Sequence, residues 1–281
     1  MPKIATHSQT AAVKLDYGAY APHAKVTHIL SFLTRIGLGR GAFAKQLCKL
    51  WRKWHGDQVD ITVRGICYRL DLSNNITDKK ILCSSRVYDA LELQALSKAC
   101  GKNGVFVDLG ANVGYYSLAM TQAGASRVIA IEPNPKALNR LRFNINANAA
   151  EAKVTVLPYG AGDGNPCDLF FCGDLGSASV IKSENSAAST IRIQTKTLKD
   201  LLKEANTDRI DGMKVDIEGN ECAVLSHFFG EAPQSLWPSV LVLEHCHSDS
   251  WSESLSTLLS AKGYDQTGET RSNLIFTFAG H

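Results

Sequence analysis

The segment that most constrains the fold is a short apolar run, Val105–Leu109, which leads directly into a glycine-rich turn, 110–114, and then into a helical pattern, 115–123. A short apolar run between glycines is typical of a buried strand. Short apolar runs and amphipathic segments continue to alternate as far as the C-terminus. This alternation predicts an α/β fold with a doubly wound, mostly parallel sheet that is covered by helices on both faces.

The positions of the individual elements follow from the same pattern and from turn and cap residues. Asn134 followed by Pro135 is typical of a helix start. We expect strands at 59–63, 66–72, 105–109, 127–131, 154–157, 213–217, 240–243 and 274–278. We expect helices at 90–100 and 115–123, after Asn134, between the strands at 213–217 and 240–243, and from Ser250 to Gly263. The stretch 166–197 interrupts the alternation and is expected to be a strand-rich insertion, either a lid or a surface hairpin.

The N-terminal part of the chain differs from the rest in charge. The first 55 of the 281 residues hold nine Lys or Arg and one acidic residue, a net charge of +8, whereas the whole chain carries +3. Apolar residues recur at helical spacing over 24–54. We therefore divide the chain into a basic, partly helical N-terminal extension, 1–57, and a domain, 58–281. The helical stretch either packs on the domain with a solvated basic face or contacts an anionic membrane surface.

Composition limits the setting in which the chain works. The eight cysteines form no C-x-x-C pair, the first 20 residues lack an apolar signal core, and no apolar run has the length of a membrane span. We expect a reduced, cytoplasmic enzyme, free or peripheral to the membrane. Beyond residue 55 the net charge is −5, the difference between +3 and +8, which does not favour nucleic acid as a partner. The oligomeric state is left open.

The glycine-rich turn carries the strongest functional signal. Gly110 allows a sharp turn and a close approach of a ligand to the backbone, and Gly114 lets the helix start close to the strand. Asp108 and Asn112 flank the first glycine. The next strand ends in Glu132, 22 residues after Gly110. A carboxylate at that position can accept hydrogen bonds from two ribose hydroxyls. We therefore predict a nucleoside-containing cofactor at this loop and Glu132.

The type of nucleoside follows from charge. A dinucleotide fold uses G-x-G-x-x-G, because the pyrophosphate rests on backbone N–H groups at a helix start. This chain has G-x-x-x-G, and Asp108 places a negative charge where a pyrophosphate would lie. S-adenosylmethionine carries an ammonium and a sulfonium and suits such a site. The alternatives are a nicotinamide-dependent oxidoreductase and a non-catalytic cofactor-binding or scaffold protein.

Three motifs together resemble the FkbM family of methyltransferases. They are V-F-V-D-L-G-A-N-V-G at 105–114, I-E-P-N-P at 131–135 and M-K-V-D-I-E-G-N-E at 213–221, with weaker similarity at 75–82 and 197–202. The resemblance covers about residues 60–280. It implies a class I methyltransferase (Rossmann-like) fold, whose sheet has seven strands with the last one antiparallel. It also implies transfer of the sulfonium methyl group, most often to a hydroxyl oxygen of a sugar, glycolipid, polyketide or related metabolite. At the matching positions the resemblance implies that Asp108, Gly110, Asn112 and Gly114 line the methionine part of the cofactor.

Candidate catalytic groups follow the later strands. Asp216 and Glu218 alternate with apolar residues, and Glu244 and His245 follow the strand at 240–243. In a doubly wound sheet these strand ends lie beside the cofactor loop. We predict that one of these four groups acts as a general base toward an acceptor hydroxyl. Glu218 capping the next helix and His245 lying on the surface are the structural alternatives.

The acceptor is expected to be a small molecule or a glycan. Oxygen and nitrogen ligands are present among the four candidate groups, but their spacing is not diagnostic of a metal site. We therefore predict no metal, with magnesium chelation by a diol as the alternative. The sequence does not identify the acceptor or the position that is methylated.

Overall fold

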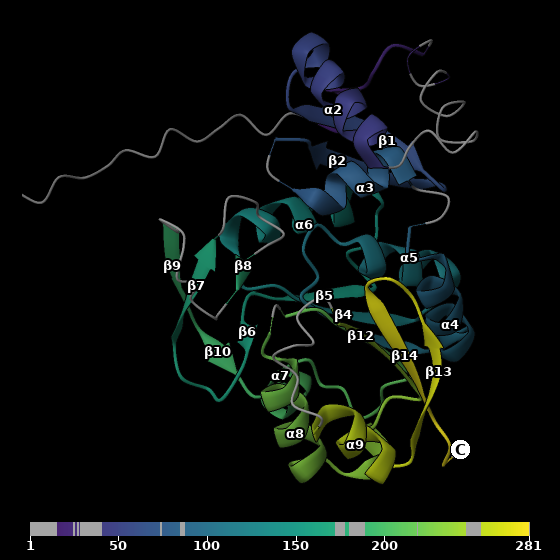
Figure 1. The fold of residues 1–281 in the computed structure, drawn as a ribbon, viewed down its shortest axis with the longest axis vertical. Coiled ribbons are helices and arrows are strands. Elements are labelled where there is room, and N and C mark those ends of the chain that lie inside the picture. The colour runs from purple at the N-terminus through teal and green to yellow at the C-terminus, as the bar shows by residue number, and fades with distance from the viewer. Residues whose placement is uncertain are drawn as a thin grey trace, which may run out of the picture.

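A seven-stranded sheet forms the centre of the structure (Figure 1). The computed structural model describes residues 16–24, 26, 28, 41–73, 75–84, 88–171, 178–179, 189–217, 219–245 and 254–280. Across the sheet the strands are β13 (Tyr264–Glu269), β14 (Asn273–Phe278), β12 (Val240–Glu244), β11 (Gly212–Val215), β3 (Val105–Leu109), β4 (Arg127–Ile131) and β5 (Val154–Leu157). From β12 to β5 all neighbours are parallel, and β14 is antiparallel to both of its neighbours. The predicted doubly wound, mostly parallel sheet is confirmed, including its antiparallel last strand.

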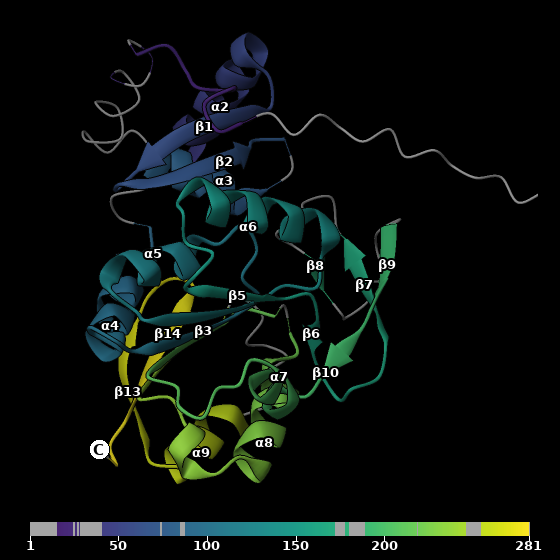
Figure 2. The ribbon, with the colours of Figure 1, turned by 180° about the vertical axis from the view of Figure 1, so that it is seen from behind.

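Helices cover both faces of this sheet (Figures 1 and 2). One face carries α4 (Ala90–Cys100), α5 (Tyr115–Ala123) and α6 (Pro135–Ala147), and the other carries α7 (Leu198–Glu204), α8 (Glu221–Glu231) and α9 (Ser254–Ala261). Successive side chains of β3 point to opposite faces of the sheet. Phe106 therefore packs in the core beneath α4, α5 and α6, and Val107 packs in the core beneath α7, α8 and α9. No helix among the described residues is both long and apolar enough to cross a bilayer.

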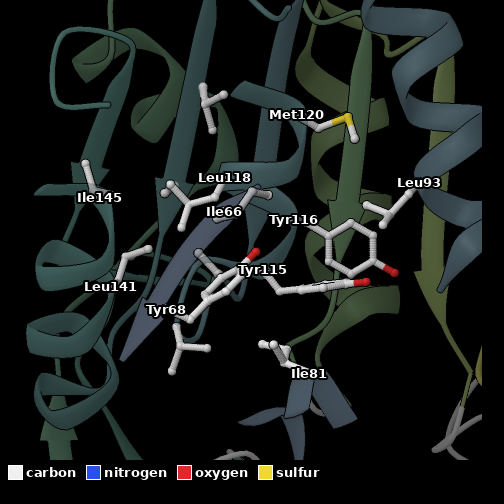
Figure 3. Close-up of a cluster of buried hydrophobic side chains, with 14 of the residues drawn as sticks. Ile66, Tyr68, Ile81, Leu93, Tyr115, Tyr116, Leu118, Met120, Leu141 and Ile145 are labelled. Carbon is white, nitrogen blue, oxygen red and sulfur yellow. The ribbon is translucent and has the colours of Figure 1, made fainter. Parts of the chain in front are cut away.

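A third layer packs over α6 (Figures 1 and 2). It consists of α2 (Gly41–His55), the hairpin β1 (Gln58–Val63) and β2 (Ile66–Asp71), and α3 (Ile76–Ser84). Asn144 of α6 accepts a hydrogen bond from the backbone N–H of Arg69 at 2.8 Å, which joins the hairpin to the domain. Figure 3 shows side chains of this layer, Tyr68 and Ile81, in one cluster with residues of α5 and α6.

Two smaller sheets stand at the carboxyl edge of the central sheet. The first contains β7 (Cys167–Phe171), β8 (Ala178–Ser179) and β9 (Ser189–Ile193), all antiparallel. In the second, β6 (Gly160–Ala161) pairs in parallel with β10 (Thr195–Lys196). The strand-rich insertion expected at 166–197 is confirmed for its described part, and these short strands wall one side of the site described below.

Some expected elements differ from the structure. Strand β13 was not expected, because it is an edge strand in which Tyr264 alone is buried, so no regular alternation marks it. Helix α3 was not expected either, since it is short and has no clear apolar stripe. Strand β11 ends at Val215, two residues earlier than predicted. The start of the last helix near Ser250 and most of the first half of the helical stretch at 24–54 lie outside the described residues.

Candidate active site

A cavity of about 320 Å³ lies at the carboxyl ends of β3, β4, β11 and β12. Its volume falls within the range of about 300–1,000 Å³ that is usual for small-molecule sites. Loop residues after these strands form its floor, α3 and Tyr88 form one wall, and Leu169 and Ile193 of the small antiparallel sheet form the other. Ligands of doubly wound sheets bind at this edge, where the strand order reverses on either side of β3.

The loop after β3 is held in place by its neighbours on both sides. The backbone N–H groups of Gly110 and Ala111 both donate to the carbonyl of Ile131, at the end of β4, at 3.0 Å. Gly110 has φ +87°, and a Cβ on it would lie 1.9 Å from the carbonyl oxygen of Asp216. This close backbone approach requires glycine at position 110, and the positive φ agrees with the sharp turn that the sequence predicted there. Asn112 also has a positive φ of 49°, and its side-chain oxygen accepts a hydrogen bond from Asn75 at 2.9 Å.

Glu132 lies at the end of β4 with its side chain buried against this loop. One carboxylate oxygen accepts the backbone N–H of Asn112 at 2.7 Å and the other accepts that of Asn134 at 2.8 Å. A carboxylate has about four acceptor positions, so these two bonds leave capacity for a ligand in the cavity that Glu132 lines. Burial raises the pKa of Glu132, and the two backbone hydrogen bonds lower it. Burial is the larger effect, so the pKa is raised to about 7.

The side chain of Asn134 also indicates that this cavity can bind a ligand. Its oxygen accepts the N–H of Lys136 and so caps α6, as the sequence predicted. Its Nδ2 is buried and, within the described part of the chain, has no hydrogen-bond partner. Asn134 lines the cavity beside Glu132. Because a buried donor without a partner is costly, this N–H₂ group fits a hydrogen-bond acceptor on a bound molecule.

Asp108 lines the cavity and also caps a helix. One oxygen of its buried carboxylate accepts the backbone N–H of Ser117 at 2.9 Å and the Ser117 hydroxyl at 2.6 Å. Burial raises the pKa of Asp108 to about 6, and the bonds from Ser117 act in the opposite direction. Asp108 therefore anchors the first turn of α5 beneath the loop. Gly114 stands at the start of the same helix with φ +90°, against Leu141 of α6.

Asp216 and Glu244 meet where β11 and β12 end. The two carboxyl groups interact through a hydrogen bond, and both line the cavity. Lys214 lies beneath them, with its Nζ 3.4 Å from Oδ2 of Asp216 and donating to the carbonyl of Val215 at 3.1 Å. Burial works against ionisation of Asp216, but the ammonium of Lys214 and the hydrogen bond from Glu244 outweigh it, so the pKa of Asp216 lies below its ordinary value.

The other two candidate catalytic residues are not brought to this point by the described structure. The ring of His245 is hydrogen-bonded through Nε2 to the carbonyl of Thr270 at 3.1 Å, and His245 is not among the described residues that line the cavity. Glu218 lies outside the described residues, so its role stays a prediction. Glu221 accepts the backbone N–H groups of Ile217 and Gly219, which supports the start of α8. In the described part of the chain, no group of three His, Cys, Asp or Glu side chains is arranged to hold a metal ion.

Sequence reasoning missed several residues of the cavity. The sequence motif at 213–221 includes Lys214, but the pattern does not predict that Lys214 lines the cavity together with Asp216. Tyr88 and Tyr116 were missed because they come from segments before and after β3. The hydroxyl of Tyr116 donates to Asp89 at 2.8 Å, and Tyr88 stacks on Tyr115 with ring centroids 4.7 Å apart. Figure 3 shows Tyr115 and Tyr116 side by side on α5.

The fold and the site together define a class I methyltransferase architecture. The antiparallel β14 lies between β12 and β13, the glycine-rich loop follows β3, and an acidic residue ends β4. The model of the methyltransferase FkbM domain matches residues 108–271, which is more than half of the chain. The chain belongs to the FkbM methyltransferase domain family, as its motifs predicted.

Individual proteins that are similar to this chain share between 13% and 34% of their residues with it over the parts that match. Methyltransferase sdnD of Sordaria araneosa is 27% identical over 198 residues, covering 59% of this chain and 75% of that protein. Ribosomal protein L11 methyltransferase of Carboxydothermus hydrogenoformans is 34% identical over 89 residues, covering 28% of this chain and 29% of that protein. Among solved structures, the METTL16 methyltransferase domain is 13% identical with a TM-score of 0.49, covering 85% of this chain and 79% of that one.

Proposed function

We propose that this protein transfers the methyl group of S-adenosylmethionine to a hydroxyl oxygen of a small-molecule or glycan acceptor. The observation that carries the proposal is a single cavity that contains both the nucleoside-type features and a carboxyl pair. Glu132 and the loop after β3 line one part of it, and Asp216 and Glu244 line another. A donor and an acceptor bound in the same cavity would be held in the proximity that methyl transfer requires.

The residues of the cavity fit S-adenosylmethionine, which supplies an activated methyl group on a sulfonium when bound. Glu132 would accept the ribose hydroxyls, and the unpartnered amide of Asn134 would donate to the nucleoside. Asp108, Gly110, Asn112 and Gly114 would surround the methionine part. Of the described charged residues that line the cavity, four are acidic and two are basic, so their formal charge suits a cation better than a pyrophosphate. They are Asp108, Glu132, Asp216, Glu244, Lys80 and Lys214.

The carboxyl pair supplies a general base. Because Asp216 has a pKa below its ordinary value, it is ionised at neutral pH and can accept the proton of an acceptor hydroxyl. Glu244 contributes by donating its hydrogen bond to Asp216. His245 stays a prediction as a base, since its Nε2 bonds to the carbonyl of Thr270 and it is not among the described residues that line the cavity.

Replacing Asp216 with Asn, or Glu244 with Gln, is expected to lower the rate of methyl transfer by about 10²–10⁴-fold, the contribution of a positioned base. The assay incubates the protein with methyl-labelled S-adenosylmethionine and a panel of sugars, nucleotide sugars, glycolipids and polyhydroxylated metabolites, and detects products by mass spectrometry. Asp163→Asn is the matched control, because Asp163 is exposed and hydrogen-bonds only within its own turn through Asn165.

The same assay separates the alternatives. Adding tRNA and duplex DNA to the panel tests nucleic-acid methylation, and labelled nucleic acid would contradict the proposed acceptor class. An oxidoreductase would instead bind NAD and show a change in nicotinamide absorbance. Full transfer activity in Asp216→Asn, with unchanged cofactor binding, would rule out the proposed base.

We also propose that α2 contacts an anionic membrane surface. Leu50 and Trp54 of α2 are 56% and 73% exposed, which is unusual for such large apolar side chains. They are one helical turn apart, and the exposed Lys45, Lys49 and Lys53 form an adjacent stripe at the same spacing. Tryptophan and leucine beside lysines are typical of helices that lie in the headgroup region of anionic bilayers.

Sedimentation with vesicles tests this surface. The protein is expected to bind vesicles that contain phosphatidylserine more tightly than phosphatidylcholine vesicles, and Leu50→Ser with Trp54→Ser should reduce that binding at least about tenfold. Leu91→Ser is the matched control, because Leu91 is 58% exposed but lies on α4. Equal binding by the control and the double variant would contradict the proposal.

A further inference from the structure

Lys214 occupies an unusual position for a lysine. It lies in β11 at the centre of the sheet, opposite Asp108 of β3 and Val242 of β12, and its side chain is 2% exposed. Lysine is almost never fully buried unless it is paired. Of the described lysines, it has the strand position closest to the carboxyl pair, two residues before Asp216. Its burial therefore calls for a compensating interaction in the site itself.

The compensation comes from carboxylates on several elements. Lys214 Nζ is 3.4 Å from Asp216 and 5.6 Å from the centroid of the Tyr116 ring. Burial lowers the pKa of Lys214, but Asp216 first, and then Glu244, Asp89 and Asp108, raise it above its ordinary value. The lysine is therefore an ammonium, and it is shared by four acidic groups, of which Asp216, Glu244 and Asp108 line the cavity.

The acids around this ammonium differ in the direction in which their pKa is shifted. Asp108 and Asp89 both have a pKa raised to about 6 by burial, whereas the pKa of Asp216, the nearest acid, is lowered. Without a cation, four acids so close together would take up protons, because like charges disfavour the ionised form. Lys214 lies 3.4 Å from Asp216 and is the strongest favourable influence on the ionised form of that acid.

We propose that Lys214 is the positioning residue that holds Asp216 as the charged member of the carboxyl pair, so that Asp216 can accept the proton of the acceptor hydroxyl. This inference rests on the proposed function. As the acceptor oxygen forms its bond to the methyl carbon, its O–H bond breaks and the proton passes to Asp216. The electron pair of the broken carbon–sulfur bond stays on sulfur. The ammonium supplies the fixed positive charge at this point of the site.

The charged and titratable groups that face the Asp216–Lys214 pair come from every surrounding element. They are Asp89 before α4, Asp108 of β3, Glu244 of β12, Lys80 of α3, and the hydroxyls of Tyr88 and Tyr116. Lys80 also lowers the pKa of Asp216, but less than Lys214 does. Lys80→Met is therefore the matched control for removal of a positive charge from the cavity.

The test reads the carboxyl groups directly and needs no acceptor. Protein labelled with ¹³C at the Asp and Glu carboxyl carbons is titrated by NMR, and the Asp216 signal is assigned from its loss in Asp216→Asn. In Lys214→Met the pKa of Asp216 is expected to rise by about 1–3 units, the range for loss of a close opposite charge. Lys80→Met should give a smaller rise, and Lys214→Arg should leave the pKa low. An unchanged Asp216 titration in Lys214→Met would overturn the inference.

Two further measurements keep the outcome clear. If Lys214→Met does not fold, the double variant Lys214→Met with Asp216→Asn should fold again, because it removes the acid nearest to the lost ammonium together with that ammonium. A double variant that also fails to fold would show that Lys214 serves the core alone and would overturn the inference. Calorimetry of the wild type with S-adenosylhomocysteine distinguishes failure of the proposed function from failure of the role of Lys214. An absence of binding would contradict the proposed function. Binding together with an unchanged Asp216 titration in Lys214→Met would contradict only the role of Lys214.

Discussion

Replacing Glu132 with Ala is expected to weaken the binding of S-adenosylmethionine by at least about 100-fold. Two hydrogen bonds from ribose hydroxyls to a carboxylate contribute about 1.5–3 kcal/mol each, and 2.7 kcal/mol corresponds to about 100-fold in affinity. The substitution also frees the backbone N–H groups of Asn112 and Asn134 that Glu132 now accepts, which loosens the loop after β3. Isothermal titration calorimetry with S-adenosylmethionine and S-adenosylhomocysteine measures the effect.

Two variants control for this result. Glu151 is an exposed glutamate in the turn after α6, and its carboxylate accepts a hydrogen bond from Asn146 of that helix. In Glu151→Ala the cofactor affinity should therefore stay within about twofold. Glu132→Gln keeps the shape but loses the charge and one acceptor, and should be intermediate. Unchanged affinity in Glu132→Ala, with a folded protein, would remove Glu132 from the cofactor site.

Replacing Gly110 with Ala is expected to lower the free energy of unfolding by about 3–5 kcal/mol, as the sum of backbone strain and overpacking. A Cβ at this position would lie 1.9 Å from the carbonyl oxygen of Asp216, and the atom it meets is backbone, which cannot rotate away. The loop after β3 would have to move from the end of β11, so cofactor binding should be lost as well. Thermal and urea unfolding measure the first effect, and calorimetry measures the second.

Gly164→Ala separates the two causes. Gly164 has a similar positive φ of 93°, but nothing lies within 4 Å of a Cβ built there. Only the left-handed backbone strain of about 1–2 kcal/mol applies. Equal losses of stability in the two variants would mean that the backbone approach of Gly110 to Asp216 does not constrain the loop.

The sequence predicted the parts of the fold that local patterns define. The strand Val105–Leu109 and the helix Tyr115–Ala123 were predicted to the residue, because buried apolar runs and glycines mark their ends. Strand β13 was not, since its exposed edge position leaves no alternation in the sequence. The family resemblance supplied the antiparallel last strand, which periodicity alone does not reveal.

The candidate site was predicted in part for a similar reason. Asp108, Gly110 and Glu132 belong to short motifs that follow strands, and the structure places all three at one cavity. The hydrogen bonds from Ser117 to Asp108, which hold the first turn of α5, were not predicted. The ammonium of Lys214 is shared with Asp216 and with three acids that are distant in sequence, Glu244, Asp89 and Asp108, and single-sequence patterns do not report such contacts.

The account depends most on the claim that Glu132 and the loop after β3 bind the adenosine of a positively charged cofactor. A crystal structure of the protein with S-adenosylhomocysteine tests this claim directly. We predict both ribose hydroxyls within about 3 Å of the Glu132 carboxylate and the amide of Asn134 bonded to the nucleoside. Adenosine bound elsewhere, with Glu132 still accepting only the N–H groups of Asn112 and Asn134, would contradict the account.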